Sequence, residues 1–432
     1  MKTIVNPPPS AWKELITRPG LDTESLTPIV RRVFKAVRQK GDKALSHYTL
    51  KYDGVRIDNC TVSQEEIDHA ALSVPRNIRD AMSLATGTIT KFHKAPSIRQ
   101  ESITTVPGVT CWREYRPIEK VGIYIPGGTA PLFSTVLMLA IPAQIAGCRE
   151  IVMCTPPGRD GTINPLILAA AKMSGISTVY KVGGIQSIAA MTFGTNTVPK
   201  VDKIFGPGNQ YVTAAKQMAQ SLGTAIDMPA GPSEVLIIAD QNADPDFVAA
   251  DLLSQAEHGV DSQVLLLTTD TRLARATQSA LRKQLKELPR QSIIRKALQN
   301  SRCVIFPSVS QCIQFSNAYA PEHLIIAVKN PDRLIPKIES AGSVFLGQYS
   351  CESAGDYASG TNHTLPTNGY ARMYSGVTTE SFMKSVSFQK LTASGLRRIG
   401  SAVESMAEAE QLLAHKMAVT IRLKILEKGV AG

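Results

Sequence analysis

Short apolar runs alternate with helix-like segments through the middle of the chain. Residues 121–125 have the uninterrupted apolar character of a buried strand, and residues 134–146 follow with the composition of a helix. The same order recurs after strand-like runs at 151–154, 178–182 and 201–205, and it resumes at 235–239 and 263–267. Repeated strand–turn–helix units predict mostly parallel sheets with helices on both faces.

The two ends of the chain lack this alternation. Residues before 122 are more helical and polar, with a few strands expected near 106–114, and a long helix is expected over about 401–428. We therefore predict an α/β protein with two Rossmann-like parallel-sheet domains and helical N- and C-terminal extensions. The predicted parts are an arm (1–21), a first α/β domain (22–123 and 234–377), a second α/β domain (124–233) and a helical tail (378–432).

Glycine-rich turns at 126–128, 183–184 and 206–209 connect strands to helices. Such turns can present backbone N–H groups to phosphates. None of them has the G-x-G-x-x-G pattern, so the usual dinucleotide fingerprint is absent. By themselves the turns indicate only an α/β protein.

The net charge of +11, from 47 basic and 36 acidic residues, could attract an anionic cofactor, a membrane surface or nucleic acid. No block of five like charges and no aromatic–basic RNA-binding pattern occurs. We therefore expect no nucleic-acid partner and interpret the charge as a solvated surface that attracts an anionic cofactor.

Membrane insertion and disulfide bonding are not expected either. The longest apolar run, 136–147, is too short to span a bilayer and is interrupted by Pro142. The N-terminus has no apolar signal core. The seven cysteines are scattered and form no C-x-x-C pair, which excludes both a disulfide framework and a thiolate zinc site. This usage fits a reducing cytoplasm.

Two segments could carry proton transfer or metal binding. Gln255 and His258 are spaced i, i+3 near the end of a predicted helix and offer oxygen and nitrogen ligands on one face. Alternatively, His258 interacts with the last helix carbonyls and Gly259 caps the helix. Glu322 and His323 are expected in a loop at a strand entrance, where they offer two proton-transfer groups. The alternative is a surface ion pair.

Two further segments combine carboxylates with histidines. Asp356 and His363 lie in a stretch rich in Gly, Ser and Asn that is expected to be a loop. Asp356 could be a metal ligand, or it could form an Asx turn beside a solvated His363. Glu410 and His415 are about 140° apart on the expected C-terminal helix, with about 7.5 Å of rise. At this separation Glu410 and His415 would contact a single bound group from two sides. Alternatively, they belong to an exposed charged face of the helix.

Taken together, these segments closely resemble the histidinol dehydrogenase family. The resemblance runs from about Val30 to Leu423 and is looser over 378–400. It is carried by IDMPAGPSEVLIIAD (226–240), QAEH (255–258), KIFGPGN (203–209), PEH (321–323), SAGDYASGTNH (353–363) and AHK (414–416).

The resemblance implies an enzyme that oxidises L-histidinol through L-histidinal to L-histidine with two NAD and one water, in the last steps of histidine biosynthesis. It implies one Zn²⁺ per subunit, held by Gln255, His258, Asp356 and His415, which acts chiefly as a template for the substrate. His323 would remove protons in both oxidations, and Glu322 would activate water for attack on the aldehyde.

The resemblance also implies how the remaining residues are used. Substrate would contact Ser233 and Glu410 in addition to His323 and the metal ligands, and NAD would bind the second α/β domain near Tyr124, Gln186 and Asn209. A homodimer is implied whose active site is shared through the C-terminal tail. Two alternatives stay open: another zinc- and NAD-dependent alcohol or aldehyde dehydrogenase, and a noncatalytic metal-responsive or nucleic-acid-binding module with the same fold.

Overall fold

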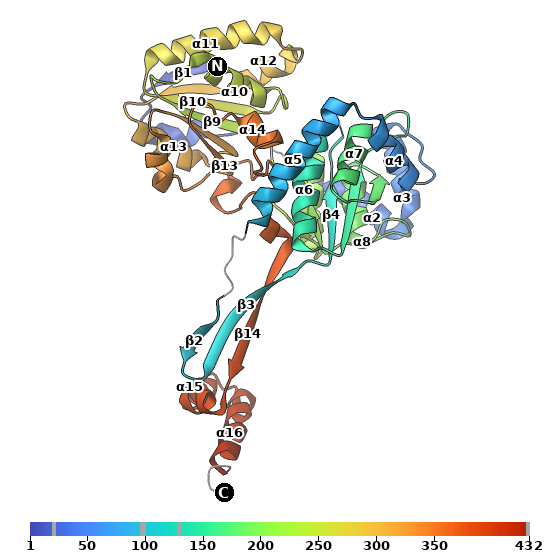
Figure 1. The fold of residues 1–432 in the computed structure, drawn as a ribbon, viewed down its shortest axis with the longest axis vertical. Coiled ribbons are helices and arrows are strands. Elements are labelled where there is room, and N and C mark those ends of the chain that lie inside the picture. Colours follow the sequence, from blue (N-terminus) through green and yellow to red (C-terminus); the bar gives the residue numbers. More distant parts are fainter. Residues whose placement is uncertain (20–22, 96–100, 128–130, 429–432) are drawn as a thin grey trace. The chain divides into compact units, whose positions relative to one another are not determined.

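The computed structural model describes residues 1–19, 23–95, 101–127 and 131–428, which belong to two compact units (Figure 1). The first unit comprises Met1–Lys94 and Ile118–Phe382, and the second comprises Ala95–Pro117 and Met383–Gly432. The end of the predicted arm and part of the predicted 126–128 turn lie outside the described residues. In the described part of the chain, no helix has both the length and the apolar character that a bilayer crossing requires.

One sheet of the first unit has five parallel strands in the order β6-β5-β4-β7-β8. The strands are β4 (Lys120–Tyr124), β5 (Glu150–Thr155), β6 (Thr178–Lys181), β7 (Lys203–Phe205) and β8 (Ala225–Ile226). The alternating helices are α6 (Phe133–Ala146), α7 (Pro165–Met173), α8 (Gly184–Phe193) and α9 (Gln210–Ser221). The strand order reverses between β4 and β7, and open α/β sheets bind ligands at such a switch point.

The other sheet of the first unit has six parallel strands in the order β1-β11-β10-β9-β12-β13. The strands are β1 (Lys2–Val5), β9 (Glu234–Ala239), β10 (Gln263–Thr268), β11 (Arg302–Ile305), β12 (His323–Ala327) and β13 (Ser343–Leu346). Its helices are α1 (Trp12–Leu15), α10 (Pro245–Ala256), α11 (Thr271–Gln284), α12 (Gln291–Gln299), α13 (Val309–Tyr319) and α14 (Glu352–Tyr357).

Short 3₁₀ segments complete this unit: η1 (Pro9–Ala11), η2 (Leu285–Glu287), η3 (Pro331–Lys337), η4 (Tyr370–Arg372) and η5 (Thr379–Phe382). Strand β9 is buried along its whole length because it contributes to two apolar cores. Val235 and Ile237 pack into one core, whereas Leu236 and Ile238 pack into the other. This two-sided burial explains the continuous apolar runs in the sequence.

Side-chain caps fix the helices that present candidate site residues. The Oδ1 of Asn209 accepts hydrogen bonds from the N–H groups of Tyr211 (3.1 Å) and Val212 (3.2 Å) at the start of α9. Asp244 caps α10 in the same way, and Pro245 occupies the first helical position. The predicted α/β architecture with parallel sheets is confirmed.

The helices before residue 94 pack differently from the predicted division. Residues 22–123 were expected to join the sheet of residues 234–377. Instead, α2 (Thr23–Lys40) shares a core with α8 and α9, which belong to the five-stranded sheet. The helices α3 (Asp42–Asp53), α4 (Gln64–Ser73) and α5 (Arg76–Lys94) pack against α8, α7 and α6, respectively, which are helices of the same five-stranded sheet. An amphipathic stripe shows that a helix must be buried, but not against which sheet.

The second unit corrects the prediction of a wholly helical tail. It contains an antiparallel sheet of β2 (Ile103–Val106), β3 (Val109–Pro117) and β14 (Met383–Leu391) in the order β14-β3-β2. Two helices follow, α15 (Ala393–Ala409) and α16 (Leu413–Lys428). Strand β14 carries polar residues at most positions and is largely exposed, so it has no apolar run to reveal it.

Candidate functional site

The predicted proton-transfer pair lies at the amino end of β12, and both side chains are buried. The Oε2 of Glu322 accepts hydrogen bonds from the backbone N–H of Glu234 (2.7 Å) and from Nε2 of Gln255 (3.3 Å). The Nδ1 of His323 lies 3.2 Å from the carbonyl oxygen of Glu234. Because a carbonyl only accepts, Nδ1 carries a proton and Nε2 is the atom available for proton transfer. The alternative of a surface ion pair is wrong.

Two carboxylates on α14 face this imidazole. The Oδ1 of Asp356 lies 3.5 Å from Nε2 of His323, and the Oε1 of Glu352 lies 3.9 Å from its Nδ1. Glu352 is 1% exposed, yet it was not among the predicted site residues. The segment that contains Asp356 and His363 was expected to be a loop. For its first part this expectation is wrong, because residues 352–357 form a helix. The i, i+4 spacing from Asp356 is the signal that could have identified Glu352.

The electrostatics of the cluster follow from crowding carboxylates in a buried place. Burial raises the pKa of Glu322 to about 8. For His323, burial disfavours the imidazolium, but the surrounding carboxylates, Glu322 and Glu352 foremost, outweigh it and raise the pKa to about 10. The cluster by itself thus favours a positive charge at its centre.

The residues around His323 fit a metal ion. Ligand atoms of His258, Glu352 and Asp356 lie within 4.8 Å of one another. Three buried atoms have no hydrogen-bond partner: Oε1 of Gln255, Nε2 of His323 and Oδ1 of Asp356. Buried polar atoms are nearly always satisfied, and a bound ligand would satisfy these three. Nitrogen and oxygen donors of these types suit a borderline cation such as Zn²⁺.

His363 forms hydrogen bonds that connect this cluster to a neighbouring helix. Its Nδ1 donates to the carbonyl oxygen of Asp356 (3.0 Å), and its Nε2 lies 3.2 Å from the hydroxyl of Thr135 on α6. Since the carbonyl can only accept, Nε2 accepts from the hydroxyl. The alternative of a solvated His363 is therefore wrong, and the histidine ties α14 to a helix of the five-stranded sheet.

One cavity lies beside the cluster, and a second cavity adjoins the first. One, of about 690 Å³, is lined by Ser233, His258, Glu322 and Asn209. The other, of about 860 Å³, is lined by Tyr124, Gln186 and Asn209. The side chain of Gln186 is fully buried, and neither of its polar atoms has a partner. Tyr124 is the last residue of β4, so the larger cavity lies at the carboxyl end of the five-stranded sheet, as expected for a nucleotide.

Glu410 and His415 belong to the second unit and not to the cluster described above. Glu410 is the C-cap residue that follows α15, and His415 lies in the first turn of α16. The prediction of one continuous helix is wrong, because Gln411 has a φ of +59° and interrupts it. The angle of about 140° that we expected between Glu410 and His415 therefore does not apply, because it assumed that both lie on one helix. The first unit alone supplies Gln255, His258 and Asp356.

Two parallel α/β sheets with a cavity at strand ends and a buried cluster of ionisable side chains are the features of an α/β enzyme. The chain belongs to the histidinol dehydrogenase family, whose family model matches residues 16–423. It is 53% identical to the histidinol dehydrogenase of Bacteroides thetaiotaomicron, over 99% of this chain and 100% of that one.

Other relatives agree. Identity to the Vibrio cholerae histidinol dehydrogenase is 52%, over 96% of each chain. The crystal structure of histidinol dehydrogenase from Elizabethkingia anophelis superposes with a TM-score of 0.97 at 59% identity and covers 99% of both chains. The chain is thus an oxidoreductase of histidine biosynthesis, which excludes the noncatalytic alternative.

Proposed function

We propose that the chain oxidises L-histidinol to L-histidine in two NAD-dependent steps at a zinc site, with histidinal held between them. The observation that carries this proposal is the convergence of three unsatisfied buried atoms, on Gln255, His323 and Asp356, next to Glu322. A bound cation or ligand would satisfy these atoms, and the smaller cavity opens beside them.

The proposed Zn²⁺ ligands are Gln255, His258, Asp356 and His415. A bound Zn²⁺ would supply a Lewis-acidic template for the amino and imidazole nitrogens of histidinol. It would also offset the carboxylates that raise the pKa of His323, so that the imidazole is neutral and able to act as a base. Ser233, which lines the smaller cavity, and Glu410 are the further proposed substrate contacts.

The proton transfers follow from the orientation of His323 and Glu322. Nε2 of His323 takes the hydroxyl proton as the carbinol carbon loses a hydride, which gives the aldehyde. The carboxylate of Glu322 then takes a proton from water as the water oxygen adds to the aldehyde, and the protonated His323 returns its proton to the aldehyde oxygen, which gives the hydrate and leaves His323 neutral again. The hydrate loses a second hydride and a second hydroxyl proton, again to His323, which gives the carboxylic acid. NAD supplies the hydride acceptor in each oxidation.

The larger cavity is the proposed NAD site. Tyr124, Gln186 and Asn209 line it, and the two buried polar atoms of Gln186 are free to pair with a ligand. Asn209 lines both cavities, so a dinucleotide in one can reach a substrate in the other. We interpret both sheets as Rossmann-like. The seven cysteines are unpaired, which supports a reducing, cytoplasmic location.

We further propose a homodimer in which the second unit of one copy completes the site of the other through His415 and Glu410. The helix α16 supports this proposal, because it exposes apolar side chains along its length. Leu413, Met417, Ile421 and Ile425 are each more than half exposed. Apolar side chains grouped in this way are typical of a surface that a partner covers.

Glu322→Gln is expected to slow oxidation of histidinal more than oxidation of histidinol, because only the aldehyde step needs activated water. General-base loss would lower the aldehyde rate by about 10²-fold or more. Single-turnover assays with each substrate measure the two steps separately. Glu65→Gln, at an exposed position, is the matched control. Equal slowing of both steps would assign Glu322 a role other than water activation.

A further inference from the structure

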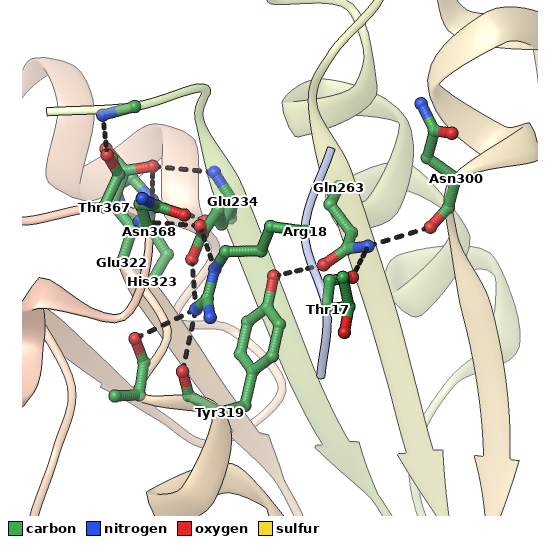
Figure 2. Close-up of polar contacts among 12 residues, drawn as sticks. Thr17, Arg18, Glu234, Gln263, Asn300, Tyr319, Glu322, His323, Thr367 and Asn368 are labelled. Atoms are coloured by element: carbon green, nitrogen blue, oxygen red, sulfur yellow. Dashed lines mark hydrogen bonds and ion pairs between the residues drawn. The ribbon is translucent and has the colours of Figure 1, made fainter. Parts of the chain in front are cut away.

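Arg18 and Glu234 form a buried ion pair beside the proton-transfer residues (Figure 2). The Nε of Arg18 donates to Oε1 of Glu234 (2.5 Å), and its Nη2 donates to Oε2 (2.8 Å). The backbone N–H of Asn368 donates to the same carboxylate (2.8 Å). The side chains are 11% and 2% exposed. A carboxylate this buried needs its partner, and the paired geometry is specific to a guanidinium.

Arg18 also binds the segment that leads into the proton-transfer pair. Its Nη2 donates to the carbonyl oxygens of Tyr319 (2.7 Å) and Ala320 (3.3 Å), and the guanidinium lies 3.8 Å from the centre of the Tyr319 ring. Ala320 has a φ of +54°, in the left-handed region that alanine rarely adopts. The hydroxyl of Tyr319 is anchored in turn on Oε1 of Gln263 (2.9 Å). Only Pro321 separates this segment from Glu322.

Glu234 connects the ion pair to the chemistry through its main chain. Its N–H donates to Glu322, and its carbonyl accepts from Nδ1 of His323. One residue therefore orients the carboxylate and sets the tautomer of the imidazole. Its own side chain is held by Arg18, which also holds residues 319–320 (Figure 2). Arg18 thus joins the entrances of two neighbouring strands, β9 and β12.

We propose that Arg18 is a positioning residue for the proton transfers, acting through Glu234 on both His323 and Glu322. The inference rests on the roles proposed for these two residues. Arg18 is not among the residues that line the two cavities of the site, so it does not contact substrate or cofactor there. Displacing a reacting group by about 1 Å can cost about 100-fold in rate.

The test begins with Arg18→Met and Arg18→Lys. Arg18→Met is expected to lower kcat about 10- to 100-fold, with KM for histidinol and zinc content close to those of wild type. Arg18→Lys keeps the charge but loses the paired geometry, so its kcat should lie between the two. Arg56→Met is the matched control: Arg56 pairs with Asp58 at the exposed surface, and its kcat should equal that of wild type.

A double variant separates positioning from stability. Arg18→Met leaves the Glu234 carboxylate buried without its partner, so its Tm should fall. Arg18→Met combined with Glu234→Gln removes both charges and should recover most of the Tm. The link to residues 319–320 is still lost, so kcat should stay at least about 10-fold low. Recovery of kcat together with Tm would show a merely structural role and overturn the proposal.

The outcome for Arg18 is distinct from a failure of the proposed chemistry. Wild-type kcat in folded, zinc-loaded Arg18→Met would contradict the positioning role while His323→Asn and Glu322→Gln remained impaired. Wild-type rates in those two variants would contradict the proposed chemistry itself. The inference would fall with it, because Arg18 acts through these two residues.

Discussion

His323→Asn is expected to lower kcat for histidinol oxidation by about 10²–10⁴, the usual contribution of general-base catalysis. The Nε2 of His323 is the unsatisfied basic atom at the centre of the cluster, and its Nδ1 is already bonded to Glu234. Both oxidations should be slowed, because we propose that the same imidazole removes a proton in each. Steady-state rates with histidinol and with histidinal measure this directly.

Zinc content and thermal stability should change little in this variant, because asparagine can keep the hydrogen bond to the Glu234 carbonyl. His69→Asn provides the control, since His69 is exposed on α4. A His323→Asn enzyme with kcat within a factor of two of wild type would remove His323 from the mechanism.

Mixing two inactive variants is expected to restore activity if the site is shared between two copies. His415→Ala and His258→Ala each remove one proposed zinc ligand, and these ligands belong to different compact units. In a dimer that exchanges its second units, each heterodimer has one site with both lesions and one site with neither. Random reassociation of equal amounts should therefore recover about a quarter of wild-type activity.

The control is each variant dissociated and reassociated alone, which should stay inactive. Heterodimers are identified by distinct affinity tags on the two chains. If purified heterodimers have no activity, every site carries a lesion, and each chain builds its own site. That outcome would contradict the shared site without affecting the assignment of Gln255, His258 and Asp356 as ligands.

The interior of the first unit was the part that the sequence predicted well. The run at 235–239 is apolar because β9 contributes to a core on each face, and such burial is visible without knowledge of the neighbours. Helix α7 begins where Asn164 caps it and Pro165 occupies the first helical position, and both are start signals that a sequence carries. Local chemistry determines these features, so local patterns reveal them.

The features that the sequence did not predict depend on contacts distant in the chain. The helices over 23–94 pack on the five-stranded sheet, although their stripes would suit either sheet. Arg18 and Glu234 are 216 positions apart in the sequence, and no local pattern around either residue predicts that they form an ion pair. Glu352 could be predicted only in part. Its i, i+4 spacing from Asp356 is visible in the sequence, but its burial beside His323 depends on how α14 packs.

The central claim is that one zinc site carries out both oxidations of histidinol with NAD. The most direct measurement is the number of NADH formed per L-histidinol consumed, before and after chelation of the metal. We predict two NADH for each L-histidine formed, no activity in the chelated enzyme, and recovery when Zn²⁺ is added back. One NADH per histidinol with release of histidinal, or full activity in enzyme shown to be free of metal, would contradict the account.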